Sequence, residues 1–354
     1  MKYCSYRRIQ LKQAAEMRRR RRENSVKKML RIKRALRPRN KQQRYRSKPQ
    51  ASYKRIILPT ISFEAPSDFS LLRAPENVIA FINNVNRTVR KSHFKCQVSV
   101  DLANVIGTDN EAIGLLLTLV NALARHNVRS FGNLPKNDNA YNIFISSGFL
   151  DRVKSLQGMR GETKDTFIVQ RGFSQPETEL VSREVKKIMS YLTGEWNKYS
   201  PLYTLINEVI FNSIEHANQR DSDKNWILAV HYAENHVRLM IADIGKGIMD
   251  TLRKRMAQSV RDTVTLKNEV DVLYDLFDRK YQSSTFEENR NQGLPKIKEL
   301  YDKRYISNLC VITNKVMLDF NGVNSRVLTN NLQGTFYSLE LNNENITTWK
   351  QRTI

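Results

Sequence analysis

Basic residues are concentrated at the N-terminal end of the chain, and this limits where a packed core can form. Residues 1–55 hold 22 of the 59 lysine and arginine residues and two acidic residues, so this segment carries a net charge of +20. The remaining 299 residues carry 37 basic and 33 acidic groups, a net charge of +4. Five consecutive arginines, at positions 18–22, repel each other unless they are solvated or face an acidic surface. We therefore expect a nearly neutral globular body with a basic extension that is disordered or partly helical.

The basic extension, residues 1–55, has the composition of a segment that binds polyanions. Between Val26 and Leu36, apolar residues recur at mostly helical spacing among lysines and arginines, which favours a helix that forms on binding. Guanidinium groups suit phosphates, and the apolar area of the segment is small. Nucleic acid is therefore the favoured partner. An anionic membrane face, an acidic partner protein and a solvated tail without a dedicated ligand are the alternatives.

Cysteine content and hydropathy bear on the location of the protein. The three cysteines, Cys4, Cys96 and Cys310, are too few and too scattered for a disulfide framework or a zinc cluster. No apolar run approaches the roughly 20 residues that span a bilayer, and the first ten residues lack the apolar centre of a signal peptide. We expect a cytoplasmic protein without a transmembrane segment.

Residues 56–155 alternate between strand-like and helix-like patterns. Alternation of this kind predicts an α/β domain in which helices cover a sheet. The predicted strands are 56–63, 96–102 and 128–131, and the predicted helices are 76–89, 110–125 and 139–149.

A second block begins near residue 165 and extends to about residue 345. Its predicted helices occur in pairs between strands, which favours an α+β sandwich with a mixed or antiparallel sheet. The predicted strands are 167–170, 226–232, 237–243, 309–313, 316–320 and 335–341, and the predicted helices are 178–192, 201–217, 247–256, 269–281 and 295–305.

The segment LINEVIFNSIEHAN, residues 205–218, places a polar stripe on an apolar helix. Glu208, Asn212 and His216 follow one another at intervals of four and therefore share one face, while leucine, isoleucine and valine fill the opposite side. The stripe indicates a site rather than a solvated surface. We interpret His216 as a capping or packing residue rather than a catalyst.

A buried-looking strand in the segment LMIADIGKGI ends at Asp243 and is followed by two glycines, Gly245 and Gly247. An aspartate at a strand end can accept a hydrogen bond from an adenine amino group. Glycines let the backbone approach a ligand closely. The segment is therefore a candidate site for a nucleotide base.

Two further segments complete the pattern. In NQGLPKIKEL, Gly293 opens a predicted helix whose free amides suit phosphate oxygens, and Gly334 and Thr335 begin the last predicted strand. In this order and spacing, the four segments resemble the N, G1, G2 and G3 boxes of the GHKL superfamily, whose ATP-binding domain has the Bergerat fold. The resemblance covers residues 173–342.

The resemblance implies ATP and Mg²⁺ as ligands. The magnesium ligand of the family corresponds to Asn212, whose amide oxygen is a hard donor. The catalytic or water-orienting acid of the family corresponds to Glu208. The aspartate that recognises adenine corresponds to Asp243, with Gly245 and Gly247 at the adenine end of the pocket.

The resemblance also assigns the phosphate end of the site. Gly293 and the helix that follows it would receive the phosphates, and Thr335 would lie near the base. Residues 248–292 correspond to the variable ATP lid, in which Arg290 is a candidate phosphate contact. Asn291 stands where the G2 box usually has its first glycine. ATP binding is therefore a firmer expectation than hydrolysis.

Residues 97–153 resemble the STAS fold of anti-sigma-factor antagonists. In that family a turn of sequence Asp-Ser-Ser-Gly precedes a helix, and its first serine is phosphorylated by a GHKL kinase. The matching residues here are Asp109, Asn110, Glu111 and Ala112. Asparagine has no hydroxyl group to phosphorylate, and Thr108 is only a weak substitute. The resemblance therefore implies the fold and a site for a protein partner without the phosphorylation.

Three functions are compatible with these observations. The leading one is an ATP-binding and ATP-hydrolysing GHKL regulatory protein, in which a STAS-like module is fused to the ATPase domain and the basic extension binds nucleic acid. The second is a serine/threonine protein kinase of the anti-sigma type, with Glu208 as the base for a hydroxyl group on another protein. The third is a binding module that uses ATP without hydrolysing it. A homodimer is an open alternative, and we expect no transducer domain after the last strand.

Overall fold

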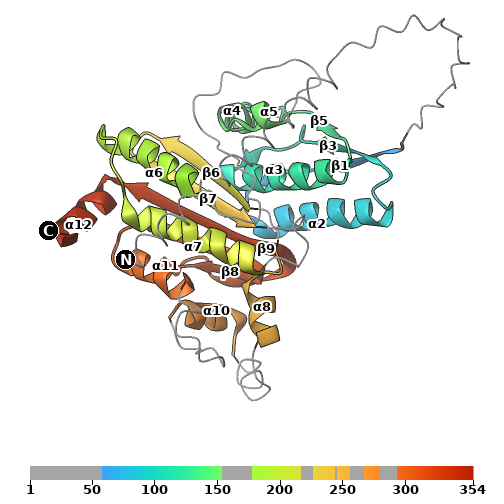
Figure 1. Cartoon of the computed structure of the whole chain (residues 1–354). Coiled ribbons are helices and arrows are strands. Elements are labelled where there is room, and N and C mark those ends of the chain that lie inside the picture. Colours follow the sequence, from blue (N-terminus) through green and yellow to red (C-terminus); the bar gives the residue numbers. More distant parts are fainter. Residues whose placement is uncertain are drawn as a thin grey trace, which may run out of the picture. The chain divides into compact units, whose positions relative to one another are not determined.

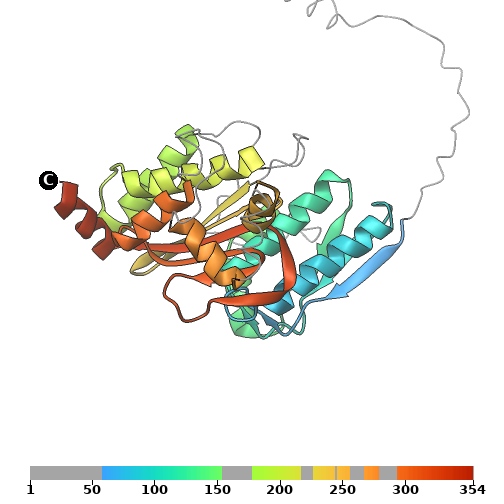
Figure 2. The same ribbon diagram turned by 90° about the horizontal axis from the view of Figure 1, so that it is seen from below.

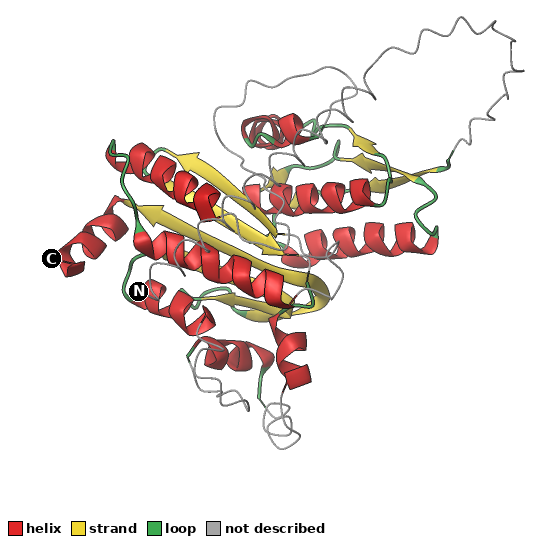
Figure 3. Ribbon diagram, in the orientation of Figure 1, coloured by secondary structure: helices red, strands yellow, loops and turns green. Residues whose placement is uncertain are grey.

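Helices and strands alternate along the described part of the chain, which comprises residues 58–153, 178–216, 226–243, 245–255, 267–278 and 293–353 of the computed structural model (Figure 1). Parallel and antiparallel sheets occur together, so the fold is mixed α/β, and Figure 3 separates its helices from its strands by colour. The predicted fold class is confirmed at this level. The basic extension, the strand predicted over 167–170 and Arg290 lie outside the described residues.

Residues 58–153 contain a parallel sheet of three strands. The strands of this part are β1 (Thr60–Glu64), β2 (Asp68–Phe69), β3 (Gln97–Asp101), β4 (Gly107–Thr108) and β5 (Ser130–Gly132), and its helices are α2 (Pro75–Lys91), α3 (Asn110–Arg125), α4 (Asp138–Ser146) and α5 (Phe149–Arg152). The order in the sheet is β1-β3-β5, while β2 pairs with β4. Parallel neighbours need a crossover connection, and α2 and α3 provide the two crossovers.

The start of α3 is fixed by Asp109, the N-cap residue. Its Oδ1 accepts hydrogen bonds from Ala112 N at 2.7 Å and Leu71 N at 3.0 Å, and its Oδ2 accepts one from Leu72 N at 3.0 Å. The first bond satisfies an amide that has no partner within the helix. The other two bonds attach the helix to the loop before α2.

Residues 178–353 contain an antiparallel sheet of four strands, in the order β6-β7-β9-β8. The strands are β6 (Trp226–Ala233), β7 (His236–Asp243), β8 (Ser307–Asp319) and β9 (Arg326–Asn342), and the helices are α6 (Thr178–Thr193), α7 (Ser200–His216), α8 (Ile248–Arg255), α10 (Glu269–Phe277), α11 (Gly293–Asp302) and α12 (Asn343–Thr353). In Figure 1, α6 and α7 lie in front of this sheet.

Both faces of the four-stranded sheet are buried. Along β6 and β7, alternate residues point to opposite faces, as the strand period of two requires. One face contributes Leu228, Val230, Leu239 and Ile241 to a core shared with α6, α7, α10 and α11. The other contributes Ile227, Ala229, Met240 and Ala242 to a core shared with α2 and α3. The sheet is therefore the middle layer between two sets of helices, and Figure 2 gives a second view of these elements.

Side chains of α2 also hydrogen-bond to the first half of β9. They are spaced seven residues apart and therefore lie on nearly the same face of the helix. The bonds are Thr329 N to Glu76 Oε1 (2.7 Å), Asn83 Nδ2 to Asn331 O (2.9 Å) and Arg90 Nη2 to Gln333 Oε1 (3.2 Å). The described residues all belong to one compact unit, Ile57–Ile354. The boundary predicted between domains at 56–155 and 165–345 stays a prediction.

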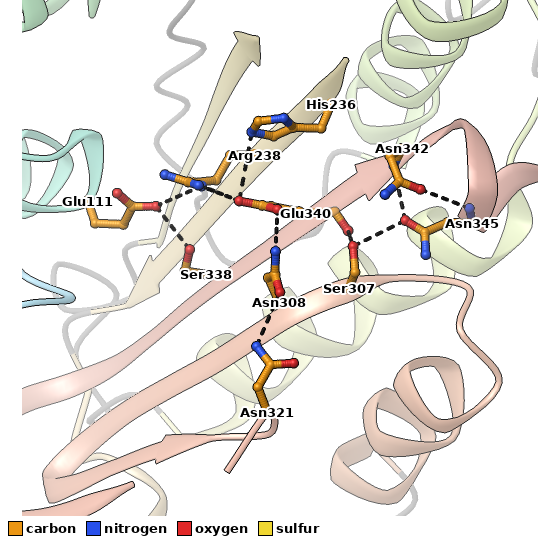
Figure 4. A network of polar contacts seen from close by, with 10 residues as sticks. All are labelled: Glu111, His236, Arg238, Ser307, Asn308, Asn321, Ser338, Glu340, Asn342 and Asn345. Atoms are coloured by element: carbon orange, nitrogen blue, oxygen red, sulfur yellow. Dashed lines mark hydrogen bonds and ion pairs between the residues drawn. The ribbon is translucent and has the colours of Figure 1, made fainter. Parts of the chain in front are cut away.

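A buried ionic network crosses from α3 to the sheet (Figure 4). Glu111 is 1% exposed, and its Oε1 accepts a hydrogen bond from Ser338 Oγ at 3.0 Å and lies 3.6 Å from Arg238 Nε. Arg238 Nε also donates to Glu340 Oε1 at 2.8 Å. The second oxygen of Glu111, Oε2, is buried and has no hydrogen-bond partner among the described residues. Burial, together with the nearby carboxylate of Asp109, raises the pKa of Glu111 to about 7.

Most of the predicted helices and strands are confirmed within a few residues, and the differences have local causes. The helix predicted over 139–149 is two helices, because Gly148 adopts a left-handed φ of 73° between them. The strands predicted over 309–313 and 316–320 are one strand, β8, whose pairing with β9 is irregular around Asn314. Strand β9 starts at Arg326, well before the predicted 335, and α12 was not predicted. Among the described residues, no helix combines the length and the apolar character that a membrane crossing needs.

The raised pKa of Glu111 predicts a pH-dependent stability. In the unfolded chain this carboxyl group loses its proton near its ordinary pKa of 4.5, whereas in the folded protein it keeps the proton until about pH 7. The free energy of unfolding should therefore fall between pH 4.5 and 7, by up to about 3 kcal/mol from this group. In Glu111→Gln, chemical denaturation should show a smaller fall. Glu234→Gln, at an exposed turn, is the control and should retain the wild-type pH dependence.

Candidate functional site

Asp243 lies at the end of β7, where two backbone amides converge on its carboxylate. Its Oδ1 accepts hydrogen bonds from Gly245 N at 2.8 Å and from Thr335 N at 3.3 Å. Asp243 and Thr335 are directly paired between β7 and β9, so the sheet register brings them together. Burial raises the pKa of Asp243 to about 6, although these amides favour the ionised form. Asp243, Gly245 and Thr335, all predicted for the adenine end, are thus joined by two hydrogen bonds to one carboxylate oxygen.

Gly334 lets β9 pass directly beside the end of β7. Its φ is +110°, a conformation that residues with a side chain rarely adopt, and a Cβ atom there would lie 2.0 Å from the carbonyl oxygen of Asp243. Any other residue at this position would push the two strands apart. The contact between Asp243 and Thr335 therefore depends on the preceding glycine.

A second cluster joins α7 and α11. Glu208 and Asn212 lie one helical turn apart on the half-buried side of α7, while Leu205, Ile206 and Val209 face the core. Gly293 is the first residue of α11, and a Cβ atom there would lie 3.0 Å from Glu208 Oε2 and 3.1 Å from Asn212 Nδ2. The start of α11 therefore packs against these two polar side chains. Three of the predicted site residues therefore lie together.

The two clusters lie towards the same end of the four-stranded sheet. Figures 1 and 2 both place the C-terminal end of α7, which carries Asn212, near α8, the helix that follows Asp243 and Gly247. Of the predicted lid, residues 248–255 and 267–278 are described as α8, α10 and their flanking residues, and Arg290 lies outside the described residues. The two clusters are thus carried by four elements, α7, α11, β7 and β9, that come near one another at this end of the sheet.

Thr313 and Asn314 of β8 belong to the same region and were not predicted. The hydroxyl group of Thr313 lies 3.3 Å from Thr335 Oγ1, and the amide group of Asn314 contacts Gly247, whose added Cβ would lie 2.2 Å from Asn314 Oδ1. The sequence did contain a signal, because the strand pattern breaks between 313 and 316. By itself, however, such a break indicates only a gap between two strands.

Two further structural findings bear on the site. A hollow of about 340 Å³ lies elsewhere, over α6 and the start of α7, and it contains no predicted site residue. The described residues contain no group of three or more histidine, cysteine, aspartate or glutamate side chains that could hold a metal ion.

Comparison with known protein families found none that matches the chain, and comparison with curated proteins found no match either. The case for a function therefore rests on the geometry of these residues.

Proposed function

We propose that this chain is an ATP-binding regulatory protein of the GHKL type, in which the four-stranded sheet and its helices form a Bergerat-fold domain. One observation carries the proposal. Residues from four separate sequence motifs meet in two clusters towards one end of the antiparallel sheet: Asp243 with Gly245 and Thr335, and Gly293 with Glu208 and Asn212.

In this proposal the adenine base binds at Asp243. Its carboxylate Oδ1 already accepts two backbone donors, so an exocyclic amino group would approach the remaining lone pairs of the carboxylate. The raised pKa of about 6 still leaves this group mostly ionised at neutral pH, and an ionised carboxylate only accepts hydrogen bonds. Such an acceptor favours the amino group of adenine over the carbonyl oxygen that guanine has at the same place.

The phosphates bind at the start of α11, beside Glu208 and Asn212. The first amides of α11 have no acceptor within the helix and suit phosphate oxygens. Gly293 lacks a side chain, so its backbone lies close to both polar side chains. The amide oxygen of Asn212 would hold Mg²⁺, which neutralises phosphate charge. Glu208 would orient or deprotonate the attacking water.

The STAS-like part, residues 58–153, is proposed as a regulatory element built into the same chain. Asn110, the first residue of α3, stands where the STAS family has its phosphoacceptor serine, and the Oδ1 of Asn110 is buried. The next residue, Glu111, is buried against Ser338 and Arg238 of the sheet. These contacts support regulation through packing rather than through phosphorylation of this turn.

Substitutions at Asp243 and Asn212 test the binding of ATP. Asp243→Asn can present an NH₂ group to the adenine amino group, and Asn212→Ala removes a magnesium ligand, so each should weaken Mg-ATP binding by roughly tenfold or more. Calorimetric titration measures the affinity. The exposed residues Asp302 and Asn197 provide controls, because Asp302→Asn and Asn197→Ala should bind as the wild type does. Wild-type affinity in both site variants would refute the assignment.

Glu208 should matter for turnover more than for binding. A carboxylate that activates water is needed mainly in the transition state, so Glu208→Gln should retain ATP affinity and lose about 100-fold in hydrolysis rate. Phosphate release measures the rate, and Glu195→Gln, at an exposed loop, is the control. Transfer of labelled phosphate to another protein would favour the kinase alternative. Absence of turnover with all partners tested would favour the non-hydrolysing module.

We further propose that residues 1–55 bind nucleic acid through phosphate contacts. Deleting them removes +20 of the +24 formal charge, so the truncated protein should bind ATP normally and lose most of its affinity for DNA and RNA. The affinity of the full chain should fall steeply with salt, because each neutralised phosphate releases counterions. Fluorescence anisotropy with labelled oligonucleotides at several salt concentrations measures both effects. Tight, salt-resistant binding after truncation would place the nucleic-acid site in the globular body.

A further inference from the structure

Helix α8 starts directly after Gly247 and therefore has no side chain of its own at the position that usually caps a helix. The first amides of an α-helix have no acceptor within the helix, and a serine, threonine, aspartate or asparagine before the helix normally supplies one. Gly247 cannot do this. The amides of Ile248, Met249 and Asp250 therefore need acceptors from another part of the chain.

Strand β8 supplies these acceptors. Ile248 N donates to Thr313 Oγ1 at 2.9 Å, and Met249 N donates to Asn314 Oδ1 at 3.1 Å. Asp250 N also donates to Asn314 Oδ1, at 3.4 Å. Two consecutive residues of a strand, more than 60 positions away in the sequence, thus cap the first turn of α8. Both side chains are buried, with Thr313 0% and Asn314 4% exposed, so water does not compete for these hydrogen bonds.

The backbone at Asn314 is shaped for this role. Its φ is +52°, and the register between β8 and β9 shifts on both sides of it, so the strand turns its side chain towards α8. Asparagine tolerates this conformation better than most residues. Its Nδ2 donates to the carbonyl oxygen of Lys246 at 3.0 Å. The same amide group therefore holds the loop before α8 and the first turn of the helix.

Thr313 also contacts β9. Its hydroxyl group donates to the carbonyl oxygen of Gly334 at 3.2 Å and lies 3.3 Å from Thr335 Oγ1. Thr335 N donates in turn to Asp243 Oδ1. One buried hydroxyl group therefore links the start of α8 to the segment of β9 that contacts Asp243. Because Thr313 is fully buried, it acts on a ligand only through these neighbours.

We infer that Thr313 and Asn314 are positioning residues of the nucleotide site: they cap α8 from β8 and thereby hold the loop Gly245–Gly247 against Asp243 and Thr335. The inference rests on the proposed function for its ligand, but the capping contacts are independent of it. When the cap is lost, the loop should sample conformations in which its backbone no longer lines the adenine end, and ATP should bind more weakly.

Thr313→Val and Thr313→Ser form a matched pair for the test. Valine has nearly the shape of threonine and lacks the hydroxyl group, whereas serine retains it. Thr313→Val leaves a buried amide without its acceptor and should weaken Mg-ATP binding of the full chain roughly tenfold, while Thr313→Ser should stay within about threefold of the wild type. Rescue by serine separates the hydrogen bond from a general packing defect.

A second variant and a second measurement complete the design. Asn314→Gly tolerates the left-handed backbone and removes the cap, so it should also lose roughly tenfold in ATP affinity. Hydrogen exchange of the protein without nucleotide should be faster at residues 248–250 in Thr313→Val and Asn314→Gly, and should match the wild type in Thr313→Ser.

The outcomes separate the inference from the proposed function. If the wild type binds ATP and Thr313→Val binds it equally well, the positioning role is wrong and the proposed function stands. If the wild type does not bind ATP, the proposed function fails and the ligand part of the inference fails with it. If exchange at residues 248–250 is unchanged in both cap variants, the capping itself is refuted.

Discussion

The four-stranded sheet has apolar side chains on both faces, and the rest of the structure follows from the need to cover them. An antiparallel sheet can leave one face to water when that face is polar. Here Ile227, Ala229, Met240 and Ala242 make the second face apolar as well, and α2 and α3 cover it. At about 25 cal/mol per Å² of apolar surface, leaving such a face exposed would cost several kcal/mol. Residues 58–153 therefore do more than form their own three-stranded sheet: their helices α2 and α3 also cover the second face of the four-stranded sheet.

The polar groups at this junction supply specificity where the apolar contacts supply stability. Glu111, Arg238 and Glu340 are placed so that one guanidinium group serves two carboxylates, and Ser338 adds a neutral donor. A buried charge network of this kind adds little net stability, because desolvation offsets the attraction between the charges. The network does, however, form only when α3 packs on the sheet in one particular position. An offset of one residue along β9 would turn Ser338 and Glu340 to the opposite face.

Much of the fold could be predicted from the sequence because periodicity and capping are local. The pattern of α3 gave its bounds, and Asp109 at its start acts as the N-cap. The clusters around Asp243 and Gly293 could be anticipated only through the resemblance of the motifs, since their members are far apart in the chain. Thr313 and Asn314 could not be found in this way. Their role comes from a register shift in β8 and a left-handed backbone conformation, which arise from tertiary contacts. For the same reason, the extension of β9 along α2 was missed, because bonds such as Thr329 N to Glu76 Oε1 join distant segments.

The contact between α2 and the first half of β9 constrains how such a chain can change during evolution. The strand that α2 holds through Glu76, Asn83 and Arg90 continues without a break into Gly334 and Thr335. A substitution that slides α2 along this strand would be transmitted to the end of β7, even though α2 itself lies in a different part of the sequence. Residues on the two sides of this contact are therefore expected to change in concert among relatives, and recombination that exchanges residues 58–153 alone would bring together mismatched surfaces.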